Sequence, residues 1–332
     1  KRQALFRAFC RQFLGTGTLR MYHIARRGYG FVALFGAIPL VAVGAGLSKK
    51  YTETITTTRG EKLSFEMVLI PGGKFLMGSP KQEPSRKDDE GPQHVVSVKL
   101  FYLCTTETPM ELFLAYYEET VRPRGESILQ EPAAEDVDGI TGPTPFYGDP
   151  TQGYGKRHPA VGMSWHNAMT FCRWLTMKTG KKYRLPTEAE WEHAVRAGAA
   201  TAYFFSDDPA QLKDYAWFEA NSGGMPHELA QKKPNPWGLY DMVGNAREWV
   251  YDYYCPTAYE KAAKNSPAVS PIGPKNGKVH VARGGDWDSP VEELRCAARA
   301  FEEKWWRMYD PQMPKSKYWL PVMHFIGFRV AR

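Results

Sequence analysis

The residues with the clearest chemical potential lie in the glycine-rich run at 238–249. Asp241 and Glu248 offer carboxylate oxygens, and Gly244 between them permits a sharp backbone turn. Such a turn can aim the intervening carbonyl oxygens at the same point as the carboxylates, and Ca²⁺ prefers an all-oxygen set of this kind. Spacing alone leaves a second interpretation open, in which Asp241 caps a turn and Glu248 pairs with Arg247.

The same run belongs to a longer pattern. The sequence NPWGLYDMVGNAREW at 235–249 resembles a signature of the formylglycine-generating enzyme (sulfatase-modifying factor) family. Five further segments resemble that family in the same order: MVLIPGGKFLMG at 67–78, HPAVGMSW at 158–165, YRLPTEAEW at 183–191, ARGG at 282–285 and GFR at 327–329. Together they frame residues 62–332, where we predict one domain of this kind.

The resemblance implies an α+β domain with a variant of the C-type-lectin fold, rich in loops around small sheets and two main helices. It also assigns calcium ligands within 241–248, namely the side chains of Asp241 and Glu248 and the carbonyl groups of Gly244 and Ala246. We therefore predict a structural Ca²⁺ that fixes the loop rather than activating a substrate. Because unrelated functions share folds, the fold alone does not identify the activity.

The copper ligands of the family are missing from this sequence. Members of the family oxidise a cysteine of unfolded sulfatases to formylglycine, with oxygen and with copper held by two cysteines, which the resemblance places between the motifs at 284–285 and 295–299. Here that span is DWDSPVEEL, which is shorter and lacks cysteine; counting from the two flanks gives Ser289 and Val291 at the two positions. Copper(I) prefers soft thiolates, so we do not expect copper. A serine nucleophile needs an adjacent base and a third group that orients the base, and no motif near Ser289 supplies them.

Two of the five cysteines are candidates for a disulfide bond. The resemblance implies that Cys172 and Cys296 are joined as a structural bridge. Closing a loop of about 125 residues would contribute roughly 4–5 kcal/mol in the chain-entropy model. The alternative is two buried free thiols, which is less expected in an oxidising compartment.

The net charge of +7 belongs to the N-terminal segment. Residues 1–50 hold nine basic residues and no acidic one, so the remainder carries −2. A nucleic-acid-binding domain normally spreads basic residues over its binding face, and this distribution therefore argues against nucleic acid as a partner. The basic and aromatic residues of 1–27 suit a juxtamembrane arm at an anionic lipid surface, with a solvated basic tail as the alternative.

Residues 28–47 carry no charge and are numerous enough to cross a bilayer as a helix. We predict an uncleaved transmembrane helix, although a cleavable signal peptide has a similar pattern. The arginines before this segment place the N-terminus in the cytoplasm and the main domain in the periplasm or outside the cell. Residues 48–61 are then an extended connector to the domain at 62–332.

Local signals predict several elements of that domain. The run at 67–77 is interrupted by a Pro-Gly-Gly sequence, which predicts a hairpin. Capping residues and glycines predict three helices, one from Thr108 to about Glu119, one from Ser164 to Gly180 and one from Thr187 to Gly198.

The segment at 301–324 concentrates aromatic side chains among prolines and basic residues. Such enrichment is typical of interface hot spots and also of a buried core. The segment lies between the motif at 295–299 and the closing GFR motif, so it closes the face where the missing cysteines would have been. We therefore expect it to cover this groove and to present a partner-binding or membrane-facing surface. The candidate residues are Trp305, Trp306, Tyr309, Tyr318 and Trp319.

These observations favour a membrane-anchored, catalytically silent member of the family that serves as a structural or accessory subunit of a membrane or periplasmic complex. Two other functions stay open at this point. One is an enzyme, either a metal-dependent oxidase or sulfatase-modifying-type enzyme with a non-standard active site, or a different chemistry built on Ser289 and its acidic neighbours Asp286 and Asp288. The other is a lectin-like receptor for a glycan or peptide.

Overall fold

The computed structural model describes residues 48–120, 151–308, 310, 315–320 and 322–332. The predicted basic arm at 1–27, the predicted transmembrane helix at 28–47 and Tyr309 lie outside these residues. Within the described ranges, no helix is both long and apolar enough to cross a membrane.

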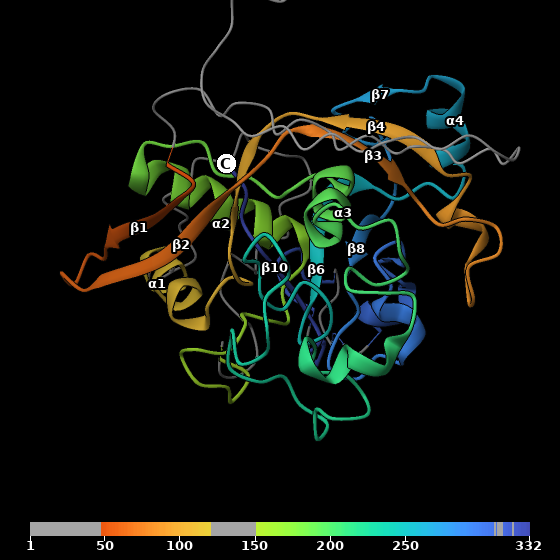
Figure 1. Cartoon of the computed structure of the whole chain (residues 1–332). Helices are drawn as coiled ribbons and strands as arrows, with labels where there is room; N and C mark the ends of the chain where they lie inside the picture. The colour runs from red at the N-terminus through yellow and green to blue at the C-terminus, as the bar shows by residue number, and fades with distance from the viewer. Residues whose placement is uncertain (1–47, 121–150, 309, 311–314, 321) are drawn as a thin grey trace, which may run out of the picture. The chain divides into compact units, whose positions relative to one another are not determined.

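The described chain is an α+β domain of three small sheets and four α-helices joined by long loops (Figure 1). The strand orders are β1-β2-β5, β10-β6-β8-β9 and β3-β4-β7. The strands are β1 (Lys50–Thr56), β2 (Lys62–Ile70), β3 (Gly73–Met77), β4 (His94–Val98), β5 (Phe101–Cys104), β6 (Arg247–Tyr253), β7 (Ala268–Val269), β8 (His280–Arg283), β9 (Arg299–Phe301) and β10 (Ile326–Phe328). The helices are α1 (Met110–Thr120), α2 (Trp165–Thr179), α3 (Glu188–Arg196) and α4 (Ala258–Lys264), with 3₁₀ helices η1 (Asp88–Glu90), η2 (Pro209–Asp214), η3 (Val291–Leu294) and η4 (Lys304–Arg307).

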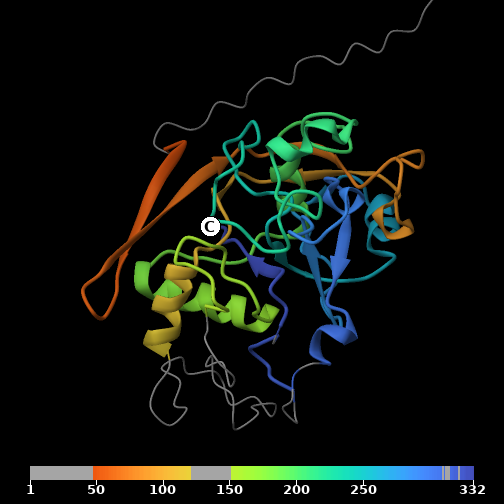
Figure 2. The ribbon, with the colours of Figure 1, turned by 90° about the horizontal axis from the view of Figure 1, so that it is seen from below.

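The domain begins earlier than the connector predicted for 48–61 implies. β1 pairs antiparallel with β2 along its whole length, from Lys50 opposite Val68 to Thr56 opposite Lys62. Its threonines and isoleucine suit an extended, half-buried strand. Figures 1 and 2 show the ribbon of these two strands extending beyond α1 and α2. The predicted connector is therefore wrong, because this stretch is part of the first sheet.

The hairpin predicted at 67–77 is also wrong. β2 pairs with β1 and β5, whereas β3 pairs with β4, so Pro71 and Gly72 carry the chain from the first sheet to the third. A Cβ at Gly72 would lie 2.8 Å from the backbone nitrogen of Leu100. Glycine is needed here because two backbones approach closely, and not because the chain reverses.

The second and third helices begin at their predicted caps. The backbone N–H of Asn167 donates to Ser164 Oγ where α2 starts. At the start of α3, Thr187 and Glu190 exchange side-chain and backbone hydrogen bonds in a capping box. These bonds satisfy N–H groups that the first helical turn leaves unpaired, which explains why the sequence alone located both starts.

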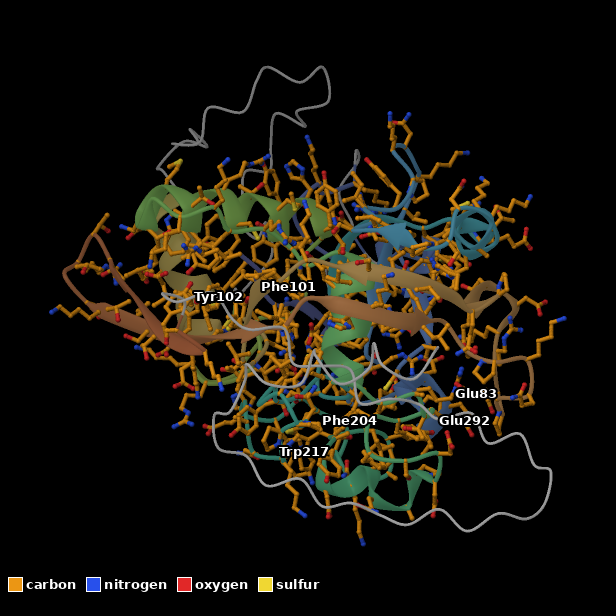
Figure 3. All side chains as sticks on the ribbon, turned by 45° about the horizontal axis from the view of Figure 1, so that its top comes forward. Glu83, Phe101, Tyr102, Phe204, Trp217 and Glu292 are labelled. Atoms are coloured by element: carbon orange, nitrogen blue, oxygen red, sulfur yellow. The ribbon has the colours of Figure 1, made fainter. Side chains whose placement is uncertain are left out.

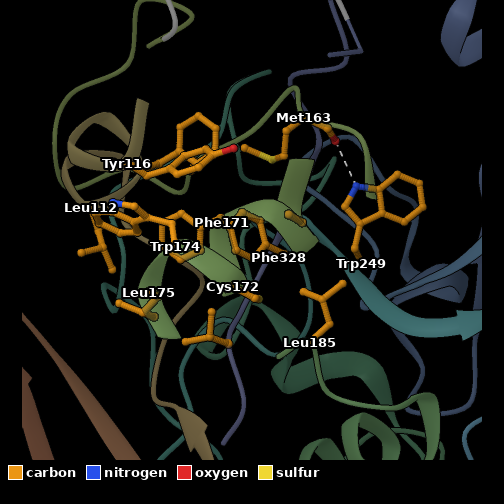
Figure 4. Close-up of a cluster of buried hydrophobic side chains, with 14 of the residues drawn as sticks. Leu112, Tyr116, Met163, Phe171, Cys172, Trp174, Leu175, Leu185, Trp249 and Phe328 are labelled. Atoms are coloured by element: carbon orange, nitrogen blue, oxygen red, sulfur yellow. Dashed lines mark hydrogen bonds between the residues drawn. The ribbon is translucent and has the colours of Figure 1, made fainter. Parts of the chain in front are cut away.

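Two hydrophobic clusters hold the elements together. The first surrounds α1 and α2 and contains Tyr116, Phe171 and Trp174 (Figure 4). The second packs α3 against β3, β4 and β8. β6 connects them, since successive strand residues point to opposite faces and place Trp249 in the first cluster and Val250 in the second.

Candidate functional site

The glycine-rich loop before β6 closes around buried carboxylates. Asp241 and Glu248 are buried, and Glu107, from the segment before α1, is buried with them. Gly244 has φ +76°, and a Cβ there would lie 2.2 Å from the carbonyl oxygen of Trp217, so only glycine allows this loop conformation. Glu107 Oε1 accepts a hydrogen bond from the side chain of Asn245 in the same loop at 3.1 Å. Three carboxylates from distant parts of the chain thus share one buried region.

Glu248 is bound by Arg329. Both carboxylate oxygens of Glu248 accept hydrogen bonds from the Arg329 guanidinium at 2.6–2.9 Å, and the indole N–H of Trp191 donates to Oε2 at 2.9 Å. Arg247 instead pairs with Asp286 and with Glu293. The alternative in which Glu248 pairs with its neighbour Arg247 is therefore wrong.

Oδ1 of Asp241 and Oε2 of Glu107 are buried and accept no hydrogen bond from an N–H group of the described residues. The two carboxyl groups are close enough to hydrogen-bond to each other when one of them is protonated. The other oxygen of Asp241 accepts from the backbone nitrogen of Ala230 at 2.7 Å. Burial raises the pKa of Asp241 to about 6, and burial together with the charge of Asp241 raises the pKa of Glu107 well above its usual range. The three carboxylates carry more negative charge than Arg329 balances.

This donor set fits a divalent cation. Unpaired, buried carboxylate oxygens suit Ca²⁺, and its two charges would balance Asp241 and Glu107. In the part of the chain that the structure describes, no three His, Cys, Asp or Glu side chains form a complete metal site, so the carbonyl ligands of Gly244 and Ala246 would be needed. Glu248 would contribute less than predicted, because Arg329 already occupies both of its oxygens. No pattern in the sequence points to Glu107, which lies far from the loop along the chain, just before Thr108.

Calcium is expected to stabilise the domain. With free Ca²⁺ at about 100 times Kd, binding to the folded state alone adds about 2.7 kcal/mol, which corresponds to a rise of several degrees in Tm over the same protein in EGTA. Asp241→Asn should lose this difference. Asp214→Asn, which alters a carboxylate that pairs with Lys233 at the surface, should keep it. Scanning fluorimetry measures both, and an unchanged calcium shift in Asp241→Asn would contradict the site.

The positions of the missing copper ligands lie beside Arg247. The buried Ser289 Oγ accepts hydrogen bonds from Arg247 Nη2 and from the backbone nitrogen of Asp286, both at 3.0 Å. Arg247 also pairs with Asp286 at 2.9 Å and with Glu293 at 2.7 Å. Val291 begins η3 and packs against the second cluster. An arginine–carboxylate network therefore surrounds the place where thiolates would be expected.

The surroundings of Ser289 do not activate it as a nucleophile. A serine nucleophile needs a base that takes its proton. The Oγ of Ser289 lies 3.5 Å from Oε2 of Glu293, which is a weak contact, and no histidine is bonded to it within the described ranges. Burial alone would raise the pKa of Glu293, but the charge of Arg247 lowers it, so this carboxylate is a poor base. Asp286 also hydrogen-bonds with Ser289, and burial raises its pKa, but its carboxylate is paired with Arg247.

A cavity of about 220 Å³ adjoins this network. Its volume is below the ~300–1,000 Å³ typical of sites for drug-sized ligands. Arg295 in its wall donates to Glu83 at 2.7 Å and to the backbone carbonyl oxygen of Glu292 at 2.9 Å, and Figure 3 labels both of these residues. The wall includes Lys87, Arg247, Gly285, Glu292 and Arg295.

The predicted disulfide is not formed, because Cys172 and Cys296 are both free thiols. Cys172 packs in the first cluster (Figure 4), whereas Cys296 packs in the second. Burial raises the pKa of each thiol to about 12, so both stay protonated and unreactive. The alternative of two buried thiols is the arrangement observed, since cysteine also packs as a small apolar side chain.

The aromatic segment divides between core and surface. Trp306, Tyr318 and Trp319 are buried, so they stabilise the domain and are not available to a partner. Trp305 is 41% exposed. The ring of Phe325 lies 5.9 Å from that of Trp305 and 6.0 Å from the Arg247 guanidinium carbon, so this region adjoins the network around Ser289. Trp305 remains the interface candidate among the described residues of this set.

Comparison with known proteins decides the family. The family described as "Sulfatase-modifying factor enzyme 1-like domain" matches residues 53–311. The chain belongs to this family. The resemblance inferred from the motifs is thereby confirmed at the level of the family and its α+β fold. The matched residues 53–311 of this sulfatase-modifying-factor-like domain include the glycine-rich loop, Ser289 and Val291.

Relatives of this sulfatase-modifying-factor-like domain carry different names. The formylglycine-generating enzyme of Streptomyces coelicolor is 31% identical over 285 residues, covering 74% of this chain and 84% of that protein. Serine/threonine-protein kinase pkn1 of Chlamydia pneumoniae is 34% identical over 245 residues, covering 70% of this chain and 35% of the kinase, so the chain spans about a third of pkn1. The solved structure of PvdO from Pseudomonas aeruginosa has a TM-score of 0.60 at 29% identity, covering 80% of this chain and 94% of that one.

Proposed function

We propose that this chain is a membrane-anchored, catalytically silent formylglycine-generating-enzyme-like protein that serves as a structural or accessory subunit of a membrane or periplasmic complex. One observation carries the proposal: the copper-ligand positions hold no thiol. The sequence has no cysteine between Gly285 and Arg295, and Ser289 is hydrogen-bonded to Arg247.

The remaining cysteines offer no replacement for a thiolate pair. Cys104, Cys172 and Cys296 are buried, and burial raises the pKa of each thiol. Copper(I) binding requires accessible thiolates, and a buried thiol of high pKa supplies none. The hydrogen bond from Thr257 lowers the pKa of Cys255, but a single cysteine is not the pair that the family uses.

Membrane attachment is supported by the sequence and by where the domain starts. The apolar residues 28–47 follow six arginines and precede β1 by only a few residues. A helix of this length and composition suits a bilayer. The main domain would then lie in the periplasm or outside the cell, directly at the membrane.

The other functions have less support. The hypothesis of an enzyme with Ser289 as its nucleophile has less support, because Ser289 makes only a weak contact with Glu293 as a base. The hypothesis of a glycan receptor has less support because the cavity is small. Kinase activity is not proposed on the basis of pkn1, since this chain corresponds to about a third of that protein.

Copper binding and turnover test catalytic silence. The full chain in mild detergent is expected to take no copper(I) from a chromophoric chelator and to convert no cysteine of a sulfatase-derived peptide to formylglycine in mass spectrometry. The Streptomyces coelicolor enzyme serves as the positive control. Stoichiometric copper, or formylglycine above the background without protein, would overturn the proposal.

The accessory role predicts a partner that copurifies through the region of Trp305. Trp305→Ala should reduce the recovered partner in quantitative mass spectrometry, whereas the exposed Met177→Ala on α2 should not. Trp306 is left unchanged because it is buried. A partner retained by Trp305→Ala would remove this residue from the interface, and reproducible recovery of the chain alone would remove the accessory role.

A further inference from the structure

The third sheet presents one face to solvent. Strand pairing places Lys74 opposite Ser97, Leu76 opposite Val95, and Ser97 beside Val269, so these five side chains share a face. We call it the outer face. Leu76 is 50% and Val269 is 68% exposed.

The opposite side of this sheet is part of the core. Val96 and Met77, which alternate with the outer residues, are buried in the second cluster. α3 packs against β3 and β4 on this side. Figure 1 shows the sheet at the top of the domain with α3 beneath it and α4 toward one end.

Three segments that form or border this sheet are basic, whereas the loop 82–90 between β3 and β4 holds Glu83, Asp88, Asp89 and Glu90 beside Arg86 and Lys87. Residues 71–81, 91–101 and 265–280 hold five lysines and neither aspartate nor glutamate, although residues 51–332 as a whole carry a charge of −2. No carboxylate of the described residues forms an ion pair with Lys74 or Lys99. The lysines are Lys74, Lys81, Lys99, Lys275 and Lys278.

The chain joins the domain at the first sheet, beside the connections that lead from β2 into β3 and from β4 into β5. The Tyr102 hydroxyl donates to the carbonyl oxygen of Ser48 at 2.8 Å, and the backbone nitrogen of Leu69 donates to the carbonyl oxygen of Lys49 at 2.8 Å. Lys99 and the exposed Leu100 lie in the short connection just before Tyr102. Only Ser48 and Lys49 separate the apolar segment ending at residue 47 from β1, and two extended residues span about 7 Å.

We propose that the outer face is a membrane-docking surface that lies on anionic lipid headgroups. This inference rests on the proposed membrane anchor. A short connection keeps the junction between the first and third sheets near the bilayer. Exposed apolar side chains can enter the interfacial region, and lysines close to the surface are attracted by anionic lipid.

A bilayer suits the outer face better than a second copy of the chain. A symmetric pairing would bring the same patch of two copies together and place like-charged lysines near each other. An anionic lipid surface instead neutralises Lys74 and Lys99 while accepting Leu76 and Val269.

Site-specific fluorescence tests the orientation in the full chain. After Cys10→Ser and Cys255→Ser, the remaining cysteines are buried, so Leu76→Cys, Val269→Cys and Met225→Cys can each be labelled with an environment-sensitive fluorophore. Met225 is 51% exposed and serves as the matched control, because it belongs to the loop between η2 and β6 and not to the third sheet. The protein is placed in nanodiscs containing phosphatidylglycerol and a lipid with a nitroxide near the headgroup.

Labels at 76 and 269 are expected to lose most of their fluorescence, while the label at 225 stays bright. Lys74→Glu with Lys99→Glu should restore the fluorescence at 76 and 269, as should discs of phosphatidylcholine alone in high salt. Equal brightness at all three positions would overturn the proposal. Protection from aqueous iodide without quenching by the nitroxide lipid would also overturn it, because a protein would then cover the face.

Alkaline carbonate extraction separates this inference from the anchor. If the chain stays in the membrane while its outer-face labels remain bright, the anchor is supported and the docking surface is refuted. If the chain is extracted, the anchor is refuted, and the labels are then measured on phosphatidylglycerol vesicles. Quenching on these vesicles supports the docking surface, and an absence of quenching refutes it.

Discussion

Arg329→Met is expected to destabilise the domain by about 3–5 kcal/mol, the cost typical of leaving a buried charge without its partner. Arg329 is buried and neutralises Glu248 through both carboxylate oxygens. Its guanidinium also donates to the backbone carbonyl oxygens of Tyr240 and Asp241, so the loss reaches the glycine-rich loop. The midpoint of urea unfolding measures the change.

An exposed ion pair is the matched control for this experiment. Arg59 pairs with Glu118 at 3.2 Å with both side chains largely in solvent, so Arg59→Met should cost about 0–1 kcal/mol. If Arg329→Met does not fold, the double variant with Glu248→Met should recover much of the stability, because it removes both charges. Similar midpoints for Arg329→Met and Arg59→Met would show that the pair at Glu248 does not hold the loop.

The wild-type domain is expected to lose folding stability in acid because of His280, and the substitution His280→Phe is expected to remove that loss. The His280 ring is buried between Trp165 and Tyr253, with centroid distances of 3.6 and 4.1 Å, and burial lowers its pKa to about 4. The folded pKa is below the unfolded value of about 6.5, so the contribution is fully present above that value and is lost as pH falls toward 4. The loss amounts to about 3 kcal/mol for a shift of this size.

The measurement is the difference in unfolding free energy between wild type and variant from pH 7.5 to pH 4.5. Phenylalanine keeps a ring between Trp165 and Tyr253 and binds no proton, so the variant gains relative stability as pH falls. His280→Gln should lose the same pH dependence but be less stable at every pH, because it lacks the stacked ring. A difference that stays constant with pH would contradict a depressed histidine pKa.

The elements that the sequence predicted are those determined by nearby residues. Thr187 begins α3 because its hydroxyl and the Glu190 carboxylate satisfy N–H groups within one helical turn. α3 ends at Arg196, and its C-cap Ala197 adopts the left-handed conformation one residue before the glycine expected to close the helix. Boundaries of this kind depend on backbone bonds local to the helix, and the prediction was accurate to a residue.

The features that the sequence missed depend on contacts between distant residues. Gly72 separates two sheets because the backbone of Leu100 passes next to it, and no local pattern reveals that approach. Cys172 and Cys296 matched two positions of a motif, yet the helix and loop that hold them pack into different clusters.

The candidate site shows the same division. Asp241 and Glu248 were found because they share one short run with Gly244. Glu107 and Arg329, which contribute to the charge of that region, come from segments far apart along the chain, one before α1 and one after β10. Family motifs located the loop, whereas burial and pairing identified which oxygen atoms are free to bind a cation.

The bonds between β5 and the residues after β10 determine when the domain can fold during its synthesis. The backbone of Tyr102 exchanges two hydrogen bonds of 2.8 Å with Arg332, and Cys104 donates to Val330 at 2.9 Å. β10 also supplies the parallel neighbour of β6, and every other described element precedes it. A nascent chain therefore exposes unpaired edges of two sheets until residues 326–332 have been synthesised, and shorter chains are exposed to aggregation and proteolysis.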